Sequence, residues 1–355
     1  MELNNTTPGH PDNTVETKED DKNLQQAEGV SSEDKGECEN LIKILAKTTL
    51  RNGVYISVIV LLIIGIGVGA WVHHNKKKQK DSTEIYEYSA AQMNELGKDY
   101  LFGSNGKPLD YDMAIKWFRK AAEENHSSAQ CYMGYMYEFG YGVELDYTEA
   151  AKWYRLSADI GNAYAQTCLG HLYLNGFGVE TDYYKAQKWF RMAAMQEEPG
   201  GQNYLAYMYE KGLGVEKDYD EAAKWYLAAA EQGFADAQKN IAKFYRDGKG
   251  VEQNYTEAIS WYRKAAEQDN VGGQIGLGYM YDVGLGVEQD YDEALKWFRK
   301  AAEQNNAYAQ TYLGFMYEEG HGVEKDLIEA IRWYKIAADQ GNEYAIEQLK
   351  IIANE

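Results

Sequence analysis

The sequence is poor in cysteine and in basic residues, and both shortages exclude classes of function. It contains only three cysteines, Cys38, Cys131 and Cys168, and their spacing matches no metal or redox motif. We interpret Cys131 and Cys168 as small side chains inside helices, with a disulfide or a reactive thiol as the alternative. Lysine and arginine number 36 against 56 acidic residues, which gives a net charge of −20. Because nucleic-acid binding needs concentrated positive charge, this balance argues against a nucleic-acid partner.

Motifs of catalysis are missing as well. The six histidines form no HExxH or similar ligand spacing. No Gly-Lys-Ser/Thr follows the repeated Gly-x-Gly pairs, so these glycines indicate turns rather than phosphate loops. We therefore predict no catalytic residue, no metal and no cofactor. A hydrolase with a site between repeats, involving His171, remains the alternative from another class.

What the chain has instead is a repeat of 36 residues. The stretch from Gly140 to Ala158 returns at Gly176, and then four more times at the same spacing. Seven tryptophans mark the phase of the repeat: Trp117, Trp153, Trp189, Trp225, Trp261, Trp297 and Trp333. A fixed period of this length is typical of a solenoid, in which each unit covers the apolar face of its neighbour.

Three different segments precede the repeats. Residues 1–50 are acidic and poor in large apolar side chains, so we expect a disordered tail. Residues 54–72 form 19 consecutive positions without a charge, which as a helix span ~28 Å and predict a single transmembrane helix. Residues 73–83 then form a basic linker, and residues 84–355 the repeat domain. A cleavable signal peptide fits the apolar segment less well, because the segment lies more than 50 residues from the start.

The predicted membrane helix has two further properties. Gly65 and Gly69 have the GxxxG spacing that lets two helices approach closely, which suggests a homodimer. Three basic residues precede the span and four follow it, so the positive-inside rule decides little. Because the alternative would export a charged tail of about fifty residues, we favour an extracytoplasmic repeat domain.

Each repeat has the pattern of a helix pair. Ala129, Met133 and Met136 lie on one face of a first helix, and Gly140 ends it. Asp146 is then a natural N-cap for a second helix, and Glu149 completes a predicted capping box. In all, we expect an all-α, right-handed solenoid of about seven such pairs, closed by an unpaired capping helix at 343–353. We expect the first helix of the array to run from Glu84 to Phe102.

These residues carry a family resemblance. The pattern A-Q-x-x-L-G-x-x-Y-x-x-G-x-G-V-x-x-D-Y-x-x-A-x-x-W-Y-x-x-A-A, clearest from Ala309 to Ala338, resembles the Sel-one-like repeat. That family is related to the tetratricopeptide repeat, with a longer loop between its helices. The resemblance implies a helical solenoid and a non-catalytic adaptor role in envelope, secretion or quality-control assemblies. It covers the chain from residue 84 onward and leaves out the tail and the apolar segment.

The resemblance also implies that positions around the Leu-Gly signature on first helices face a concave groove. The projected residues are Cys131, Tyr135 and Glu138; Thr167, His171 and Leu174; Asn203, Tyr207 and Glu210; Lys239, Lys243 and Arg246; Ile275, Tyr279 and Asp282; and Thr311, Phe315 and Glu318. Two features of this projection suggest partner binding: an aromatic row and a basic helix face. The row consists of Tyr135, His171, Tyr207, Tyr279 and Phe315, and the basic face of Lys239, Lys243 and Arg246. The turn-tip residues Tyr141, Phe177, Leu213 and Leu285 are a third candidate surface.

Each feature has a plainer interpretation. The aromatic residues are the type enriched in interface hot spots, yet they also suit packing between neighbouring first helices. The cations suit an acidic peptide or protein, yet they also suit a solvated helix face neutralised by nearby carboxylates. We hypothesise a membrane-anchored adaptor that binds a protein in the groove, with an immunity protein against a toxic effector as the alternative. A spacer that only dimerises through Gly65 and Gly69 is a third possibility.

Overall fold

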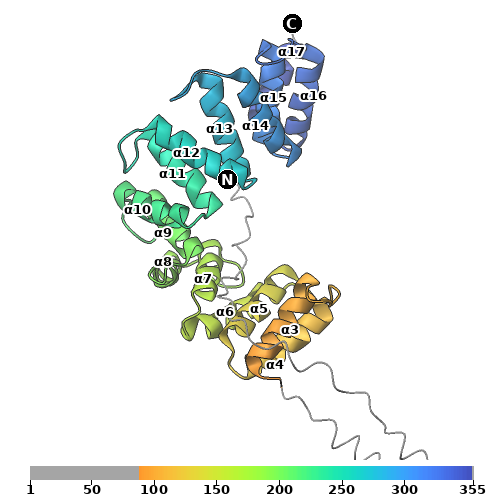
Figure 1. Cartoon of the computed structure of the whole chain (residues 1–355), viewed down its shortest axis with the longest axis vertical. Helices are drawn as coiled ribbons and strands as arrows, with labels where there is room; N and C mark the ends of the chain where they lie inside the picture. Colours follow the sequence, from red (N-terminus) through yellow and green to blue (C-terminus); the bar gives the residue numbers. More distant parts are fainter. Residues whose placement is uncertain (1–87, 354–355) are drawn as a thin grey trace, which may run out of the picture. The chain divides into compact units, whose positions relative to one another are not determined.

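The computed structural model describes residues 88–353, and within this range all regular structure is helical. The first helices of the pairs are α3 (Ala90–Phe102), α5 (Ser127–Phe139), α7 (Ala163–Asn175), α9 (Pro199–Lys211), α11 (Ala235–Asp247), α13 (Val271–Val283) and α15 (Ala307–Glu319). The second helices are α4 (Tyr111–Glu123), α6 (Tyr147–Asp159), α8 (Tyr183–Ala194), α10 (Tyr219–Glu231), α12 (Tyr255–Glu267), α14 (Tyr291–Glu303) and α16 (Leu327–Asp339). The helix α17 (Glu343–Ala353) follows without a partner, and Figure 1 shows the series running from α3 in orange to α17 in blue. The predicted helix pairs and closing helix are confirmed.

The helix ends follow from short local signals. The side chain of Asp146 accepts hydrogen bonds from the backbone N–H groups of Thr148 and Glu149, and acidic or Asn residues cap the other second helices in the same way. The other half of the predicted capping box does not form there. The carboxylate of Glu149 instead pairs with Lys152 at 2.7 Å, one turn further on. A complete capping box occurs at the start of α3, between Ser89 and Gln92.

Inside each pair, a small residue of the first helix lies against an aromatic ring of the second. A Cβ atom added at Gly134 would lie 2.6 Å from the ring of Tyr154, and one at Gly170 would lie 2.7 Å from the ring of Phe190. Both rings are fully buried. The small residues that recur in the first helices therefore serve close helix packing, as their phase predicts.

In five repeats, a buried glutamine of the first helix pairs with an exposed glutamine after the second helix, and in α7 and α11 the buried glutamine also reaches the preceding repeat. Gln196 Nε2 donates to Gln166 Oε1 at 2.9 Å, and Gln166 Nε2 donates to the carbonyl of Ala158 at 3.1 Å. The same glutamine pair, 30 residues apart, occurs in four more repeats. In the repeat that begins with α5, Ile160 replaces the donor, and Gln130 Oε1 is buried without a hydrogen bond.

The turn between the helices of a pair is part of the contact with the preceding repeat. At Gly178 the backbone has φ +64°, and an added Cβ would lie 2.2 Å from the carbonyl carbon of Tyr147. The turn-tip residue Phe177 stacks on the ring of Tyr147, with the centroids 5.1 Å apart. The predicted turn geometry is thus confirmed, and the tip serves packing between repeats.

Several predictions concern residues outside the described range. The tail 1–50, the apolar segment 54–72 with Gly65 and Gly69, the linker 73–83 and Cys38 all lie there. The first helix, expected from Glu84, begins at Ala90 in the structure because Ser89 caps it. Among the helices of residues 88–353, none is both long enough and apolar enough to cross a bilayer.

Candidate functional site

The site predicted from the sequence lies on the first helices, and the helix geometry explains which positions it takes. First helices contact the first helices of neighbouring repeats, as α7 does with α9 and α11 with α13. In α7, Leu169 and Gly170 are fully buried against the core. One residue further along a helix turns the side chain by about 100°, so His171 faces away from the second helix. The structure therefore puts the residue after Leu-Gly on the side where first helices meet.

The aromatic row consists of half-buried rings that contact their neighbours. The ring of His171 lies 5.5 Å from that of Tyr204, and the rings of Tyr135 and Phe139 lie 4.7 Å apart. Burial lowers the pKa of His171 to about 4 and raises that of Tyr135 to about 12, so both are uncharged at neutral pH. The rings of the row therefore pack between repeats on one side and present an uncharged surface to solvent on the other.

The other three members of the row each have a charged or titratable neighbour. Lys211 Nζ lies 5.7 Å from the ring centre of Tyr207, and Arg246 Cζ lies 5.8 Å from that of Tyr279. The ring of Phe315 meets the edge of the His321 ring at 5.5 Å. The Arg246–Tyr279 contact joins the basic face to the aromatic row, so the two predicted features form one continuous surface.

Several projected groove residues are buried instead, and that part of the projection is wrong. Cys131, Thr167 and Asn203 are buried, because first helices pack too closely to leave these positions open. The hydroxyl of Thr167 bonds the carboxylate of Glu198, which caps α9. The later positions Glu138 and Leu174 are buried too. The exposed part of the surface is narrower than the sequence suggested.

The basic face of α11 contains three cations with different partners. Lys239 lies 3.5 Å from the carboxylate of Asp236, and its stem runs against the backbone of Gly272. Arg246 Nε lies 2.8 Å from Asp247 Oδ1. Lys243 is exposed, and the ion pairs formed within residues 88–353 do not include it. The interpretation as a neutralised face therefore fits two of the three cations, while Lys243 presents its charge to solvent.

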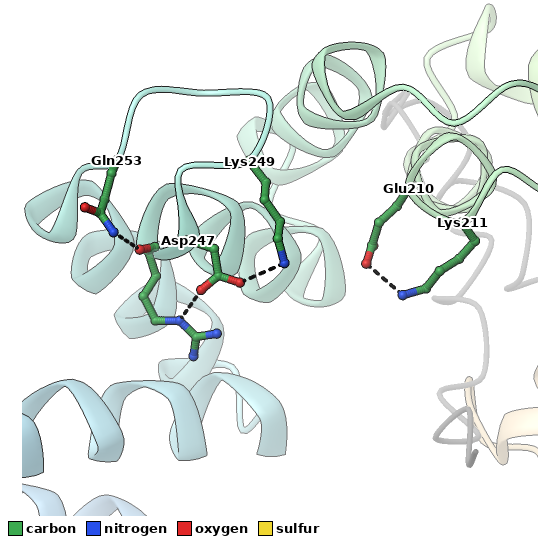
Figure 2. A network of polar contacts seen from close by, with 6 residues as sticks. Glu210, Lys211, Asp247, Lys249 and Gln253 are labelled. Atoms are coloured by element: carbon green, nitrogen blue, oxygen red, sulfur yellow. Dashed lines mark hydrogen bonds and ion pairs between the residues drawn. The ribbon is translucent and has the colours of Figure 1, made fainter.

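Figure 2 shows the wider network around this face. Lys249, in the turn after α11, pairs with the other oxygen of Asp247 at 3.2 Å, so one carboxylate holds two cations. Gln253 Nε2 donates to the backbone carbonyl of Arg246 at 2.9 Å and fixes the end of the helix. On α9, Lys211 pairs with Glu210 at 2.8 Å.

The carboxylates in this network are held in the charged form. Burial alone would raise the pKa of Asp247, but hydrogen bonds and charge from Arg246 and Lys249 lower it. Burial opposes ionisation of Glu210 as well, and hydrogen bonds from Lys211 and Tyr226 reverse the effect, so its pKa is lowered. The charges of Lys211 and Lys243 lower the pKa of Glu210 further, so each of these anions already has a cation beside it.

Lys249 belongs to the basic surface, and reasoning from the sequence missed it. It occupies the turn-tip position that holds Tyr141, Phe177, Leu213 and Leu285 in other repeats. Comparison of the residues at this turn position in successive repeats would have shown that Lys249 is a lysine where those four repeats have apolar or aromatic residues. The apolar tips themselves pack on neighbouring repeats, with Tyr141 stacked on Tyr111 at 4.7 Å.

The two cysteines of residues 88–353 lie inside the helical array. Burial raises the pKa of the Cys131 and Cys168 thiols, so neither side chain is a thiolate at neutral pH. Both cysteines are free and buried, in line with their interpretation as small helix side chains. No group of three or more His, Cys, Asp or Glu side chains within residues 88–353 is arranged to hold a metal ion.

Comparison with known proteins gives a consistent family assignment. The Sel1 repeat family matches seven consecutive segments, residues 93–126, 127–162, 163–197, 199–234, 235–270, 272–306 and 307–342. No curated protein sequence matches the chain.

Two solved structures, from Escherichia coli and Oxalobacter formigenes, show the same fold. The protein c5321, a protective antigen of uropathogenic Escherichia coli strains with an SLR fold, is 38% identical with a TM-score of 0.61. The match covers 76% of this chain and 57% of that protein's chain, so it spans little more than half of the E. coli protein. A Sel1 repeat protein from Oxalobacter formigenes is 31% identical with a TM-score of 0.62, over 69% of this chain and 96% of the other. The immunity protein Pa5087 of Pseudomonas aeruginosa is 18% identical with a TM-score of 0.43, over 60% and 81% of the two chains.

Proposed function

Because this chain belongs to the Sel1 repeat family, we propose that it is a non-enzymatic adaptor that binds a protein partner along its first helices. The binding surface consists of the aromatic row and the basic face of α11 with Lys249. Both lie on rigid helices, so the surface is formed before the partner arrives and little ordering entropy opposes binding. The proposal is supported by this surface, in which half-buried aromatic rings and basic side chains lie together on the first helices.

The observation that carries the proposal is the position of Lys243. Residues 84–355 have a net charge of −18. Among residues 88–353, the exposed Lys243 of α11 nevertheless forms no ion pair, although the cations on either side of it, Lys239 and Arg246, each form one. Lys243 acts on Glu210 only through its charge, so it can pair with a carboxylate of another molecule without first breaking a direct ion pair. Complementary charge of this kind mainly speeds association and selects the partner.

We expect the partner to present a carboxylate-rich segment. Asp247 and Glu210 are already paired with Arg246, Lys249 and Lys211. An incoming carboxylate therefore pairs with Lys243, because it need not compete with Asp247 or Glu210 for their cations. Tyr207 and Tyr279 lie on the neighbouring helices, each next to a cation, and offer ring surface for the apolar part of the same segment.

The test is a crosslinked pull-down of the full-length protein from its own membranes, read by mass spectrometry. The variant carries Lys239→Glu, Lys243→Glu and Arg246→Glu. A matched control carries Lys152→Glu, Lys224→Glu and Lys296→Glu, which reverse three exposed lysines on second helices. We expect one protein to be captured by the wild type and by the control and lost with the α11 variant. Equal capture by both variants would exclude this face as the binding site.

The identity of the captured protein separates the adaptor role from the alternative. An envelope or secretion component supports an assembly adaptor. A secreted toxin whose activity the full-length protein neutralises would instead make this an immunity protein. If hydrolysis of a captured substrate depended on His171, the chain would be an enzyme, contrary to the proposal.

We also propose that residues 54–72 anchor the protein in a membrane, on the strength of 19 uncharged positions in a row. Extraction of membranes at alkaline pH should leave the full chain in the pellet, while substitution of Val60 and Leu62 by lysine should release it. Protease protection in closed vesicles then decides the side, which we expect to be extracytoplasmic for the repeats. If Gly65 and Gly69 bring two chains together, their replacement by isoleucine abolishes crosslinked dimers.

A further inference from the structure

An open cavity of about 780 Å³ lies between α15 and the start of α17, near the C-terminal end of the array. Its lining residues are Tyr308, Thr311, Tyr312 and Phe315 from α15, and Gly341, Asn342, Glu343 and Tyr344 from the start of α17. Phe315 belongs to the aromatic row, whereas the other three aromatic residues were not singled out from the sequence. The cavity therefore extends the predicted surface beyond the last member of the row.

The walls of the cavity combine fixed and free rings. Tyr312 stacks on the buried ring of Phe298 at 4.5 Å, and Phe315 is held by His321. Tyr308 and Tyr344 are 68% and 51% exposed, so their rings stand at the rim with most of one face in solvent. A flat group entering between them would meet aromatic faces without displacing a packed side chain.

The two exposed tyrosines are a local departure from the repeat. Tyr308 and Tyr344 occupy the same repeat position, which is Ser128, Gly200, Asp236 or Gly272 in other first helices. Tyr164 is the remaining tyrosine at this position, and it packs against the hydrophobic core of its own repeats. Large exposed rings at a position that tolerates glycine are not required by the fold.

The charge of the cavity is negative. Glu343 is its one charged lining residue, and it is exposed. Neither lysine nor arginine lines it. Burial is the main cause that raises the pKa of Tyr312; Tyr279 and Asp282 of the neighbouring repeat raise it further, and Arg246 acts in the opposite sense. An aromatic cavity with a carboxylate at its rim suits a cation, since ring faces carry negative charge density.

We propose that this cavity binds an arginine side chain of the protein partner. The planar guanidinium stacks on tyrosine faces and donates hydrogen bonds to a carboxylate such as Glu343, a combination that the compact ammonium of lysine fits less well. That the side chain comes from a partner rests on the proposed function, whereas the preference for arginine rests on the cavity alone. With a carboxylate-rich segment at α11 and an arginine between α15 and α17, the partner chain can lie along the row in one direction only.

The test uses the full-length protein and a fluorescein-labelled peptide, Gly-Ser-Gly-Arg-Gly-Ser-Gly, in fluorescence anisotropy titrations. Matched peptides carry citrulline, the uncharged isostere of arginine, or lysine. We expect the arginine peptide to bind at least about fivefold more tightly than the citrulline peptide and about twofold more tightly than the lysine peptide.

Variants separate the cavity from the general acidity of the protein. Tyr308→Ala with Tyr344→Ala leaves the net charge unchanged and should remove the preference for arginine over citrulline. Tyr308→Phe with Tyr344→Phe keeps the rings and should retain it. Glu343→Gln should reduce it about threefold. The control pair Tyr183→Ala and Tyr184→Ala alters exposed tyrosines on α8 and should change nothing.

Two results would overturn the inference: equal binding of the arginine and citrulline peptides, or an arginine preference that survives in the folded Tyr308→Ala, Tyr344→Ala variant. Circular dichroism establishes the folding of each variant. The charge-reversed α11 variant should keep the arginine preference. If the wild type shows no preference for the arginine peptide, the inference about the cavity is refuted. If the α11 variant captures the partner as well as the wild type does, the proposed function is refuted.

Discussion

Tyr154 donates its hydroxyl hydrogen to the buried carboxylate of Glu138, with 2.6 Å between Tyr154 Oη and Glu138 Oε2. The two residues lie on the first and second helices of one pair, 16 positions apart. Tyr226 and Glu210 repeat the bond at 2.9 Å, and a third copy joins Tyr334 and Glu318. The carboxylates have different surroundings, however, since Glu210 also has Lys211 beside it, whereas no cation within residues 88–353 forms an ion pair with Glu138.

We predict that Glu138 and Glu210 make the stability of the protein depend on pH in opposite directions. Burial raises the pKa of Glu138, so its contribution to the free energy of unfolding falls as pH rises above about 4.5. The pKa of Glu210 is lowered, so its contribution is lost as pH falls below about 4.5. The free energy of unfolding of Glu138→Gln, relative to the wild type, should therefore increase as pH rises from about 4.5 to about 7. The same difference for Glu210→Gln should decrease as pH rises through the acidic range to about 4.5.

The measurement is denaturant unfolding of the full chain at a series of pH values between about 3.5 and 7, where both windows lie. The two variants serve as each other's control, because they make the same substitution at the same repeat position. Parallel curves for the two variants would show that the carboxylates do not differ in the way the structure indicates.

Replacing Ile160 by glutamine should stabilise the protein by about 0.5–1.5 kcal/mol. Gln130 Oε1 is buried without a hydrogen bond, whereas the matching oxygen of Gln166 accepts one from Gln196. A glutamine at 160 would supply the missing donor and also remove an exposed apolar side chain. The thermal midpoint and the urea midpoint both report the gain.

The converse substitution, Gln196→Ile, is the control for this prediction. It deletes a donor from an intact pair and should destabilise the protein by about 1–3 kcal/mol, because the buried oxygen of Gln166 is left unpaired. If neither substitution moves the midpoint, the glutamine pairs contribute no net stability.

Gly178→Ala should destabilise the array far more than Gly161→Ala. Both glycines have positive φ, which for alanine costs roughly 1–2 kcal/mol. At Gly178 the added methyl group would also overlap the backbone of Tyr147, whereas nothing lies within 4 Å of the position at Gly161. We expect roughly 1–3 kcal/mol of additional loss at Gly178, measured by denaturant unfolding. Equal losses would mean that the turn moves away from the preceding repeat without resistance.

Lys243→Gln should weaken partner binding in a salt-dependent manner. The exposed ammonium contributes long-range attraction, which is screened beyond a Debye length of about 10 Å at 0.1 M salt and about 3 Å at 1 M. Removing it should lower affinity for the captured partner about two- to fivefold at 0.05 M salt and have little effect at 0.5 M. Lys224→Gln, on the second helix of the preceding pair, should have no effect at either concentration. A salt-independent loss would indicate that Lys243 acts by shape.

The fold could be predicted because its determinants are local and recur in phase. Gly140 ends one helix and Asp146 starts the next through contacts within a few residues, so a single repeat already specifies them. The reciprocal half of the capping box at Glu149 could not be predicted, because Lys152 competes for the same carboxylate. Two favourable local interactions were available, and the sequence does not rank them.

The candidate site was less predictable, because it depends on how closely first helices approach. Thr167 and His171 are one turn apart on α7, yet one is buried and the other half-exposed. The cavity beside Phe315 was missed because it exists only where α17 meets α15. The contribution of Lys249 could have been predicted, because its position within the 36-residue repeat can be read from the sequence.

The glutamine pairs have a consequence for how such a chain can change its length. Each glutamine pair lies within one repeat, and the second glycine of each turn meets a tyrosine about 30 positions earlier in the preceding repeat, so these contacts stay within one unit or between adjacent units. Gain or loss of one whole 36-residue block would leave these contacts as they are. The reach of the first-helix surface, and with it the length of partner segment that it can hold, is therefore free to vary in whole units without redesign of the core.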